Sequence, residues 1–119
     1  MIDRVRNGHC SDERSATWSN RIHVEDCAGV IAHLVNQDTL PEVVLGSDSL
    51  PATSTDVETF IAEQLGIEKQ YADPNSKRPK RIAGSKRCDN RMLLGTGYQF
   101  THPDYRSGYQ ALIVNPIEK

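Results

Sequence analysis

Two short patterns in this sequence place side chains where they could do chemistry. His23 and Cys27 stand four residues apart, a spacing that brings two metal ligands together on one face of a helix. His9 and Cys10 pair a base with a nucleophile, but immediate neighbours in a chain seldom face each other. His23 is expected to lie on a strand before the helix, and no second pair completes a four-ligand site. We therefore predict a packed Cys27 and a hydrogen-bonded His23, with no metal site and no catalytic residue.

The motifs of cofactor-dependent enzymes are absent from the sequence. Its eight glycines stand at positions 8, 29, 46, 66, 84, 95, 97 and 108, so none forms the spaced triplet that lets a backbone approach a pyrophosphate. There is no P-loop, no Gly-x-Ser-x-Gly element and no Tyr-x-x-x-Lys pair for redox proton transfer. We therefore predict that this chain binds no cofactor and has no self-sufficient active site.

A basic segment is the clearest candidate for ligand binding. Seven of the fifteen residues from 77 to 91 are Lys or Arg, whereas residues 22–76 hold ten acidic residues and only one basic residue. This asymmetry favours either an anionic partner or a basic loop that lies on an acidic body. Nucleic acid is not the expected partner, because the segment has no aromatic side chains for base stacking and the net charge is −2.

Size and composition limit the class of protein. The chain has 119 residues and a mass of 13.3 kDa, with 37% apolar residues, so we expect one domain over residues 1–119 with a small core. The odd number of cysteines, three, is typical of a reduced protein. No apolar stretch approaches the ~18 residues of a membrane-spanning helix, and the N-terminus does not resemble a secretion signal. These features predict a cytoplasmic protein without a membrane partner.

Hydrophobic periodicity predicts two principal helices. In the first, apolar residues recur at i, i+3, i+4, i+7 and i+8 over residues 27–35 and form one stripe. The second covers residues 55–65, where a capping box from Thr55 to Glu58 marks the start and Gly66 marks the end.

Shorter elements fill the rest of the predicted fold. Strands are expected at residues 21–24 and 42–46, and the second should be buried because it is rich in valine and leucine. A long basic loop is expected over residues 68–85, and Pro103 opens a short C-terminal helix. The predicted fold class is α/β, a small mixed α+β domain with two main helices, a short C-terminal helix and short strands.

The segment Asn20-Arg21-Ile22-His23-Val24-Glu25-Asp26 resembles the Arg-Ile-His-Val-x-Asp motif of the NAD-dependent epimerase/dehydratase family, the extended short-chain dehydrogenases/reductases. Later segments are also similar to the C-terminal part of that family, in particular its sugar-nucleotide-epimerase-like group: 86–90, 97–100, 105–106 and 108–109. The resemblance covers about residues 1–115. The Rossmann domain and the catalytic motifs of the family have no counterpart in this sequence. The resemblance therefore implies a substrate-binding domain, as a fragment or a truncated homologue. NAD(P) is the cofactor of the full-length family members.

The resemblance implies where a substrate phosphate would be held. In sugar-nucleotide-handling members an arginine just before the His-Val pair contacts the diphosphate, and Arg21 stands at that position. Arg78, in an Arg-Pro pair, resembles a second such arginine. Guanidinium groups suit this task because they donate paired hydrogen bonds to phosphate oxygens. The phosphate-binding residues implied are Arg21 and Arg78, with Lys80 and Arg87 as weaker candidates.

Structural roles compete with these assignments. Arg21 could instead form an ion pair with an acidic residue in this region, such as Glu25 or Asp26, and Arg78 could belong to a disordered loop. His23 and Asp26 are expected to be structural, through hydrogen bonds in the strand–helix turn and negative charge at the helix start.

Three functional hypotheses remain open from the sequence. The first is a substrate-binding domain that is not catalytic alone and binds a nucleotide sugar weakly or together with a Rossmann-domain partner. The second is a small non-enzymatic anion- or nucleic-acid-binding module that uses residues 77–91. The third is a protein that self-associates through the face that a Rossmann domain would have covered.

Overall fold

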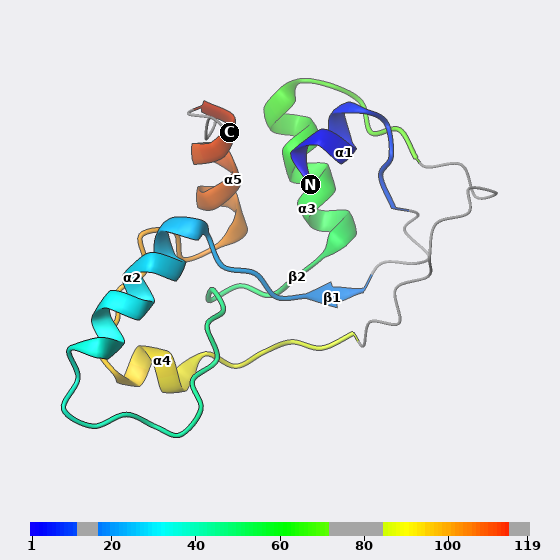
Figure 1. Cartoon of the computed structure of the whole chain (residues 1–119). Helices are drawn as coiled ribbons and strands as arrows, with labels where there is room; N and C mark the ends of the chain where they lie inside the picture. Colours follow the sequence, from blue (N-terminus) through cyan, green and yellow to red (C-terminus); the bar gives the residue numbers. More distant parts are fainter. Residues whose placement is uncertain (12–16, 72–84, 115–119) are drawn as a thin grey trace.

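The computed structural model describes residues 1–11, 17–71 and 85–114. Within these ranges the chain forms helices and one two-stranded sheet, a small mixed α/β domain that confirms the predicted fold class (Figure 1). None of the described helices has the length and apolar character needed to cross a membrane. In chain order the elements are α1 (Ile2–Arg6), β1 (Trp18–Ser19), α2 (Val24–Val35), β2 (Ala52–Thr53), α3 (Ser54–Leu65), α4 (Arg91–Gly95) and α5 (Tyr105–Val114).

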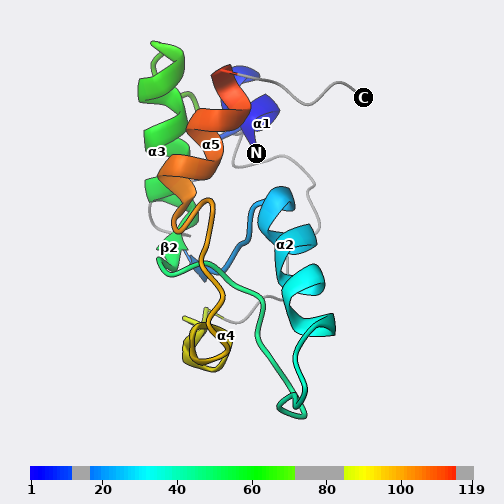
Figure 2. The same cartoon turned by 90° about the vertical axis from the view of Figure 1, so that its left-hand side faces the viewer.

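The main core lies between α1, α3 and α5. Ile61 and Val57 on α3 are fully buried, and the ring of Phe60 meets Tyr105 of α5 edge to face with 5.6 Å between ring centroids. Such aromatic pairs add to the stabilisation that the buried apolar area provides. Figure 2 shows the three helices together at one end of the molecule. The buried cluster comprises Val5, Cys10, Ala52, Val57, Ile61, Ala62 and Tyr105.

Helix α3 begins two residues earlier than its capping box predicts. The hydroxyl of Thr53, not that of Thr55, accepts the backbone N–H of Asp56 at 3.2 Å, and Gly66 ends the helix in the left-handed conformation with φ of 69°. Glu58 does not reach back to the helix start. Its buried carboxylate instead faces α1, so the apparent capping residue is part of the interior.

The predicted strands at 21–24 and 42–46 are wrong. Val24 already belongs to α2, and residues 42–46 are irregular, with 70% of Val43 and 47% of Leu45 exposed. A valine-rich run becomes a buried strand only where a neighbouring strand takes up its hydrogen bonds. In the described part of the chain the only sheet is the antiparallel pair β1–β2, where Trp18 pairs with Thr53 and Ser19 with Ala52.

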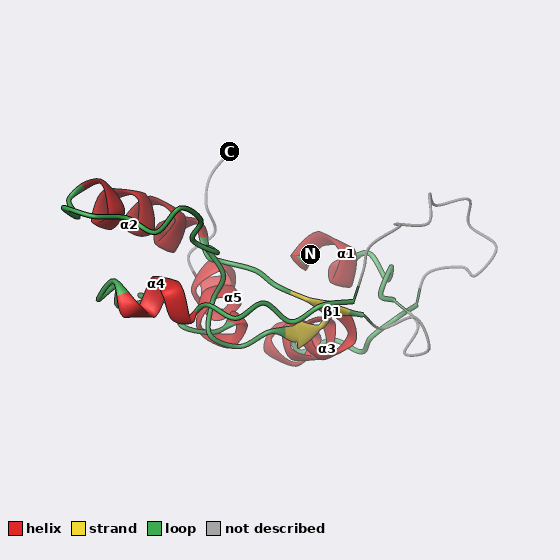
Figure 3. Cartoon of the chain, turned by 90° about the horizontal axis from the view of Figure 1, so that it is seen from below, coloured by secondary structure: helices red, strands yellow, loops and turns green. Residues whose placement is uncertain are grey.

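Helix α2 runs away from the α1–α3–α5 group, and together with α4 it forms the other end of an elongated molecule (Figure 3). The molecule measures 52 × 32 × 22 Å. One side of α2 packs on residues 96–102, but its apolar stripe is only partly covered: Val30 is buried, whereas Ile31 is 65% and Val35 72% exposed. The prediction of a packed Cys27 is also wrong, because Cys27 lies on the uncovered side of α2 and is exposed. We call Val24, Cys27, Ala28, Ile31 and Val35 the outer face of α2.

Candidate functional site

A cavity of about 290 Å³ lies where the start of α2 meets α5. Its walls come from three segments that are far apart in the sequence: residues 21–24, Asp48 and the first turns of α5. Aromatic and aliphatic side chains supply most of the lining, and a few polar groups converge on it, as is usual for small-molecule sites. The lining residues are Arg21, Ile22, His23, Val24, Asp48, Asp104, Tyr105, Gly108, Tyr109 and Leu112.

Arg21 supplies a positive charge to the lining of this cavity. One guanidinium nitrogen, Nη2, donates to the hydroxyl of Ser19 at 2.7 Å, while the buried Nη1 has no hydrogen-bond partner. Its backbone carbonyl accepts the N–H of Asp48 at 2.7 Å, which fixes the segment against the neighbouring loop. Among the described residues, Arg21 makes no ion pair with Glu25 or Asp26, so the competing prediction for Arg21 is wrong. A buried donor without a partner is costly, and an acceptor group of a ligand would satisfy it.

Two carboxylates share the cavity with Arg21. Burial raises the pKa of Asp48 to about 6; the N–H of Leu50 and the charge of Arg21 lower it, and the charges of Asp104 and Asp26 raise it further. Asp104 accepts the N–H of Ser107 at 3.0 Å at the beginning of α5. These side chains can accept hydrogen bonds from hydroxyl groups of a ligand next to the arginine.

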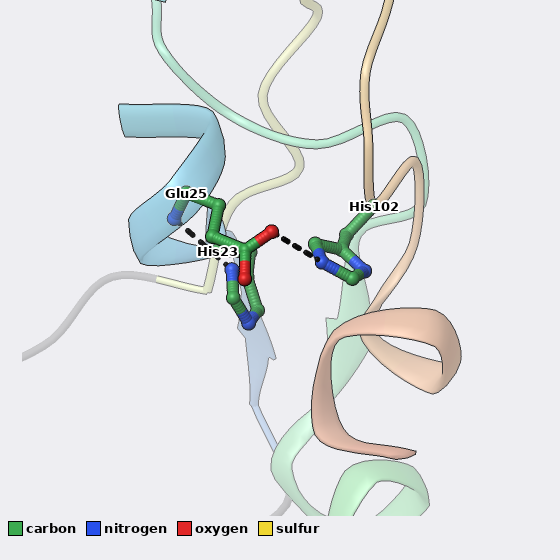
Figure 4. A group of neighbouring side chains, drawn as sticks. All are labelled: His23, Glu25 and His102. Atoms are coloured by element: carbon green, nitrogen blue, oxygen red, sulfur yellow. Dashed lines mark hydrogen bonds and ion pairs between the residues drawn. The ribbon is translucent and has the colours of Figure 1, made fainter. Parts of the chain in front are cut away.

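His23 caps α2 and faces both the cavity and a second histidine. Its Nδ1 accepts the backbone N–H of Glu25 at 3.1 Å, and its buried Nε2 has no partner. The ring packs against Gly108, where an added Cβ would lie 3.2 Å from Cδ2, a tight contact that would require the ring to shift slightly. The ring of His102 lies 4.1 Å away between centroids, and its Nε2 is 3.2 Å from the carboxylate of Glu25 (Figure 4).

Asp26 holds the start of α2 to the segment before α5. Its fully buried carboxylate accepts hydrogen bonds from the hydroxyl of Tyr98 at 2.7 Å and from the backbone N–H groups of Thr101 and His102, both at 2.8 Å. Burial acts to raise the pKa of Asp26, but these three hydrogen bonds outweigh it and the pKa is lowered. Burial and the bond to Asp26 raise the pKa of Tyr98 to about 12. The network positions the histidines without itself lining the cavity.

Among the other predicted phosphate-binding residues, the structure describes only Arg87, and it does not place Arg87 at the cavity. Arg87 lies over the indole ring of Trp18, 4.9 Å from its centroid, and does not line the cavity. Such a cation–π contact is a structural use of the guanidinium. Arg78 and Lys80, and most of the predicted loop 68–85, lie outside the described residues.

Three residues near the cavity escaped the sequence interpretation: Asp48, His102 and Asp104. A local signal existed only for Asp104, which follows Pro103 and precedes a helix, the usual position of a capping carboxylate. Asp48 lies in an ordinary turn sequence between Ser47 and Ser49. Its role depends on tertiary structure, because the loop brings it to Arg21.

Comparison with known proteins relates this chain to a solved structure. No family model matches the chain, and no curated protein matches it. A solved structure from Methylobacillus flagellatus, provisionally named an NAD-dependent epimerase/dehydratase, matches 95% of this chain with 32% sequence identity and a TM-score of 0.72. The chain spans 41% of the length of that protein. The match supports a relation between this chain and the NAD-dependent epimerase/dehydratase family.

Proposed function

We propose that this chain is the substrate-binding portion of an NAD-dependent sugar-nucleotide epimerase/dehydratase and is not catalytic alone. The observation that carries the proposal is the guanidinium-bearing Arg21 in the cavity lining, in a chain that matches a solved epimerase/dehydratase-type structure over 95% of its length. A phosphate oxygen would accept from this guanidinium, and Asp48 and Asp104 would accept from sugar hydroxyls. Tyr105 and Tyr109 offer ring surfaces to the rest of the ligand.

The described residues do not fit the cofactor of such an enzyme. A dinucleotide needs a glycine-rich turn that leads into a helix, with its pyrophosphate at the helix N-terminus. Here the first turn of α2 carries Glu25 and Asp26, whose charges oppose a pyrophosphate. Gly95 ends α4 and Gly97 follows it, so neither glycine leads into the start of a helix. NAD(P) would therefore be held by a separate Rossmann domain.

The outer face of α2 is where we place that partner. Three of its large side chains are more than half exposed: Val24 at 56%, Ile31 at 65% and Val35 at 72%. A continuous apolar stripe of this kind is typical of a surface that another structural element covers. The chain spans 41% of its structural relative, so a covering domain has room in the remaining length of that protein.

Substrate binding can be tested by substituting Arg21. We expect Arg21→Ala to weaken the binding of UDP-glucose at least ~10-fold, because a charge-assisted hydrogen bond to phosphate is worth about 1.5–3 kcal/mol. Isothermal titration calorimetry with the purified chain measures this. Arg6→Ala is the matched control, since Arg6 is exposed at the end of α1 and should leave the affinity unchanged. Equal binding by the two variants, or no binding of UDP-glucose by the original chain, would contradict the proposal.

Without its partner, the chain is expected to self-associate weakly through the outer face of α2. The double substitution Ile31→Glu and Val35→Glu should reduce this association while changing the free energy of unfolding by no more than about 0.5 kcal/mol, since both side chains are already exposed. Sedimentation velocity over a range of concentrations measures it. Val114→Glu, on α5, is the control because Val114 is equally exposed at 68% but lies elsewhere. A monomer at every concentration, or equal loss of association in the control, would argue against this face.

A further inference from the structure

We propose that His23, Glu25 and His102 form a binding site for a divalent transition-metal ion, with Zn²⁺ as the best match. The prediction from sequence, that the chain has no metal site, rested on the His23–Cys27 spacing. The structure offers a different set of ligands, because it brings His102 from 79 positions further along the chain to His23. The site shares His23 with the lining of the Arg21 cavity, but Arg21 is not among its ligands, so either proposal can fail alone.

The three side chains already stand close to coordination geometry. One potential ligand atom from each lies within 4.8 Å of the others, and Nε2 of His102 is 3.2 Å from the Glu25 carboxylate. Metal–ligand bonds of about 2.0–2.1 Å in a tetrahedral site put neighbouring ligand atoms roughly 3.3 Å apart. The carboxylate of Glu25 is 62% exposed, so it can reorient to close the remaining distance (Figure 4).

Contacts behind the histidines hold the rings in place. His102 has its Nδ1 2.9 Å from the hydroxyl of Ser107, and its backbone N–H donates to Asp26, which leaves Nε2 directed to Glu25. A metal-binding histidine is usually oriented in this manner through its other nitrogen. The ring of His23 is fixed between Gly108 and His102. Only one of its two nitrogens has a hydrogen-bond partner.

The charge around the site favours a cation. The buried carboxylate of Asp26 accepts the backbone N–H of His102, and the carboxylates of Asp48 and Asp104 lie in the adjoining cavity together with the single guanidinium of Arg21. Two imidazoles and one carboxylate suit zinc and similar metals better than Mg²⁺ or Ca²⁺, which prefer oxygen ligands. Three protein ligands would leave a fourth position open to water or a ligand.

Cobalt provides a direct probe of the proposed site. Co²⁺ titrated into the tag-free chain should bind one ion per chain with the visible absorption of a four- or five-coordinate centre, and Zn²⁺ should displace it. Glu25→Gln and His102→Gln should each weaken binding at least ~10-fold, as loss of a ligand or its support does.

Two control variants separate this site from accidental binding. His9→Gln removes an exposed histidine elsewhere, and Cys27→Ser removes the exposed thiol one turn beyond His23; both should bind Co²⁺ as the original chain does. Glu25→Gln keeps the test valid even if His102→Gln fails to fold, because Glu25 is a surface side chain. Absence of stoichiometric binding, or binding lost in either control but kept in Glu25→Gln, would overturn the proposal.

Discussion

Asp26→Ala should lower the free energy of unfolding by about 3–5 kcal/mol, the largest effect we expect from a single substitution in α2. The change removes a fully buried carboxylate and leaves the hydroxyl of Tyr98 and the N–H groups of Thr101 and His102 without an acceptor. Each buried donor without a partner costs about 1–3 kcal/mol. Asp26→Asn should cost less, because the amide keeps one accepting oxygen.

Urea denaturation followed by circular dichroism measures this effect, and Asp56→Ala is its control. Asp56 occupies the first turn of α3 as Asp26 does in α2, but its side chain is exposed. Its replacement should cost no more than about 1 kcal/mol, the value of an acidic residue near a helix N-terminus. If the two variants lost equal stability, the hydrogen-bond network would not be the cause.

The Asp26 network also predicts a pH dependence. The pKa of Asp26 is lower in the folded chain than in the unfolded chain, because its hydrogen bonds outweigh the effect of burial. A lowered carboxyl pKa gives stability that is fully present above the unfolded value, about 3.9, and is lost as the pH falls through the folded value. The urea midpoint of the original chain should therefore drop below about pH 4 more steeply than that of Asp26→Asn.

Glu58→Ala is the second substitution with a large expected effect, also about 3–5 kcal/mol, because breaking a buried ion pair leaves uncompensated polar groups. The buried carboxylate of Glu58 accepts from the guanidinium of Arg4 at 3.1 Å and from the backbone N–H and the hydroxyl of Ser11 at 2.8 and 3.1 Å. It thereby joins α1 and the following turn to α3. Arg4 is 38% exposed, so water can partly compensate the loss on its side.

Thermal and urea unfolding of Glu58→Ala and Glu63→Ala test the role of this carboxylate. Glu63 lies on the same helix but is exposed, and its replacement should change the free energy of unfolding by no more than about 0.5 kcal/mol. Glu58→Gln should fall between the two, because it keeps the volume and an acceptor while it loses the charge. A small effect of Glu58→Ala would mean that α1 contributes little to the fold.

Sequence periodicity predicted the helices better than it predicted their surroundings. The repeat of Val57 and Ile61 with Gly66 beyond it is local information, and α3 follows it closely. The capping box predicted the wrong helix start because Thr53 and Thr55 can both cap a helix. It also predicted the wrong role for Glu58, whose carboxylate bonds to the distant Arg4 and Ser11 instead. Periodicity located the apolar stripe of α2 but could not show that its outer face is left uncovered.

The candidate site shows the same division between local and long-range information. Arg21 could be identified because its segment resembles a family motif, and the structure places it at a cavity. Asp48, His102 and Asp104 carry no family or spacing signal that joins them to Arg21, because loops bring them there from separate parts of the chain. The valine-rich run at 42–46 failed as a strand prediction for a related reason, since a strand requires a second strand that the run itself does not specify.

The Asp26 network has a consequence for synthesis on the ribosome. Its donors lie 72, 75 and 76 positions after the carboxylate, so α2 is translated long before the groups that satisfy it exist. At about 5–20 residues per second, this delay lasts roughly 4–15 s. Throughout that interval Asp26 must remain hydrated, and α2 cannot dock against its final neighbours. The nascent chain therefore cannot complete this end of the molecule until His102 has been synthesised.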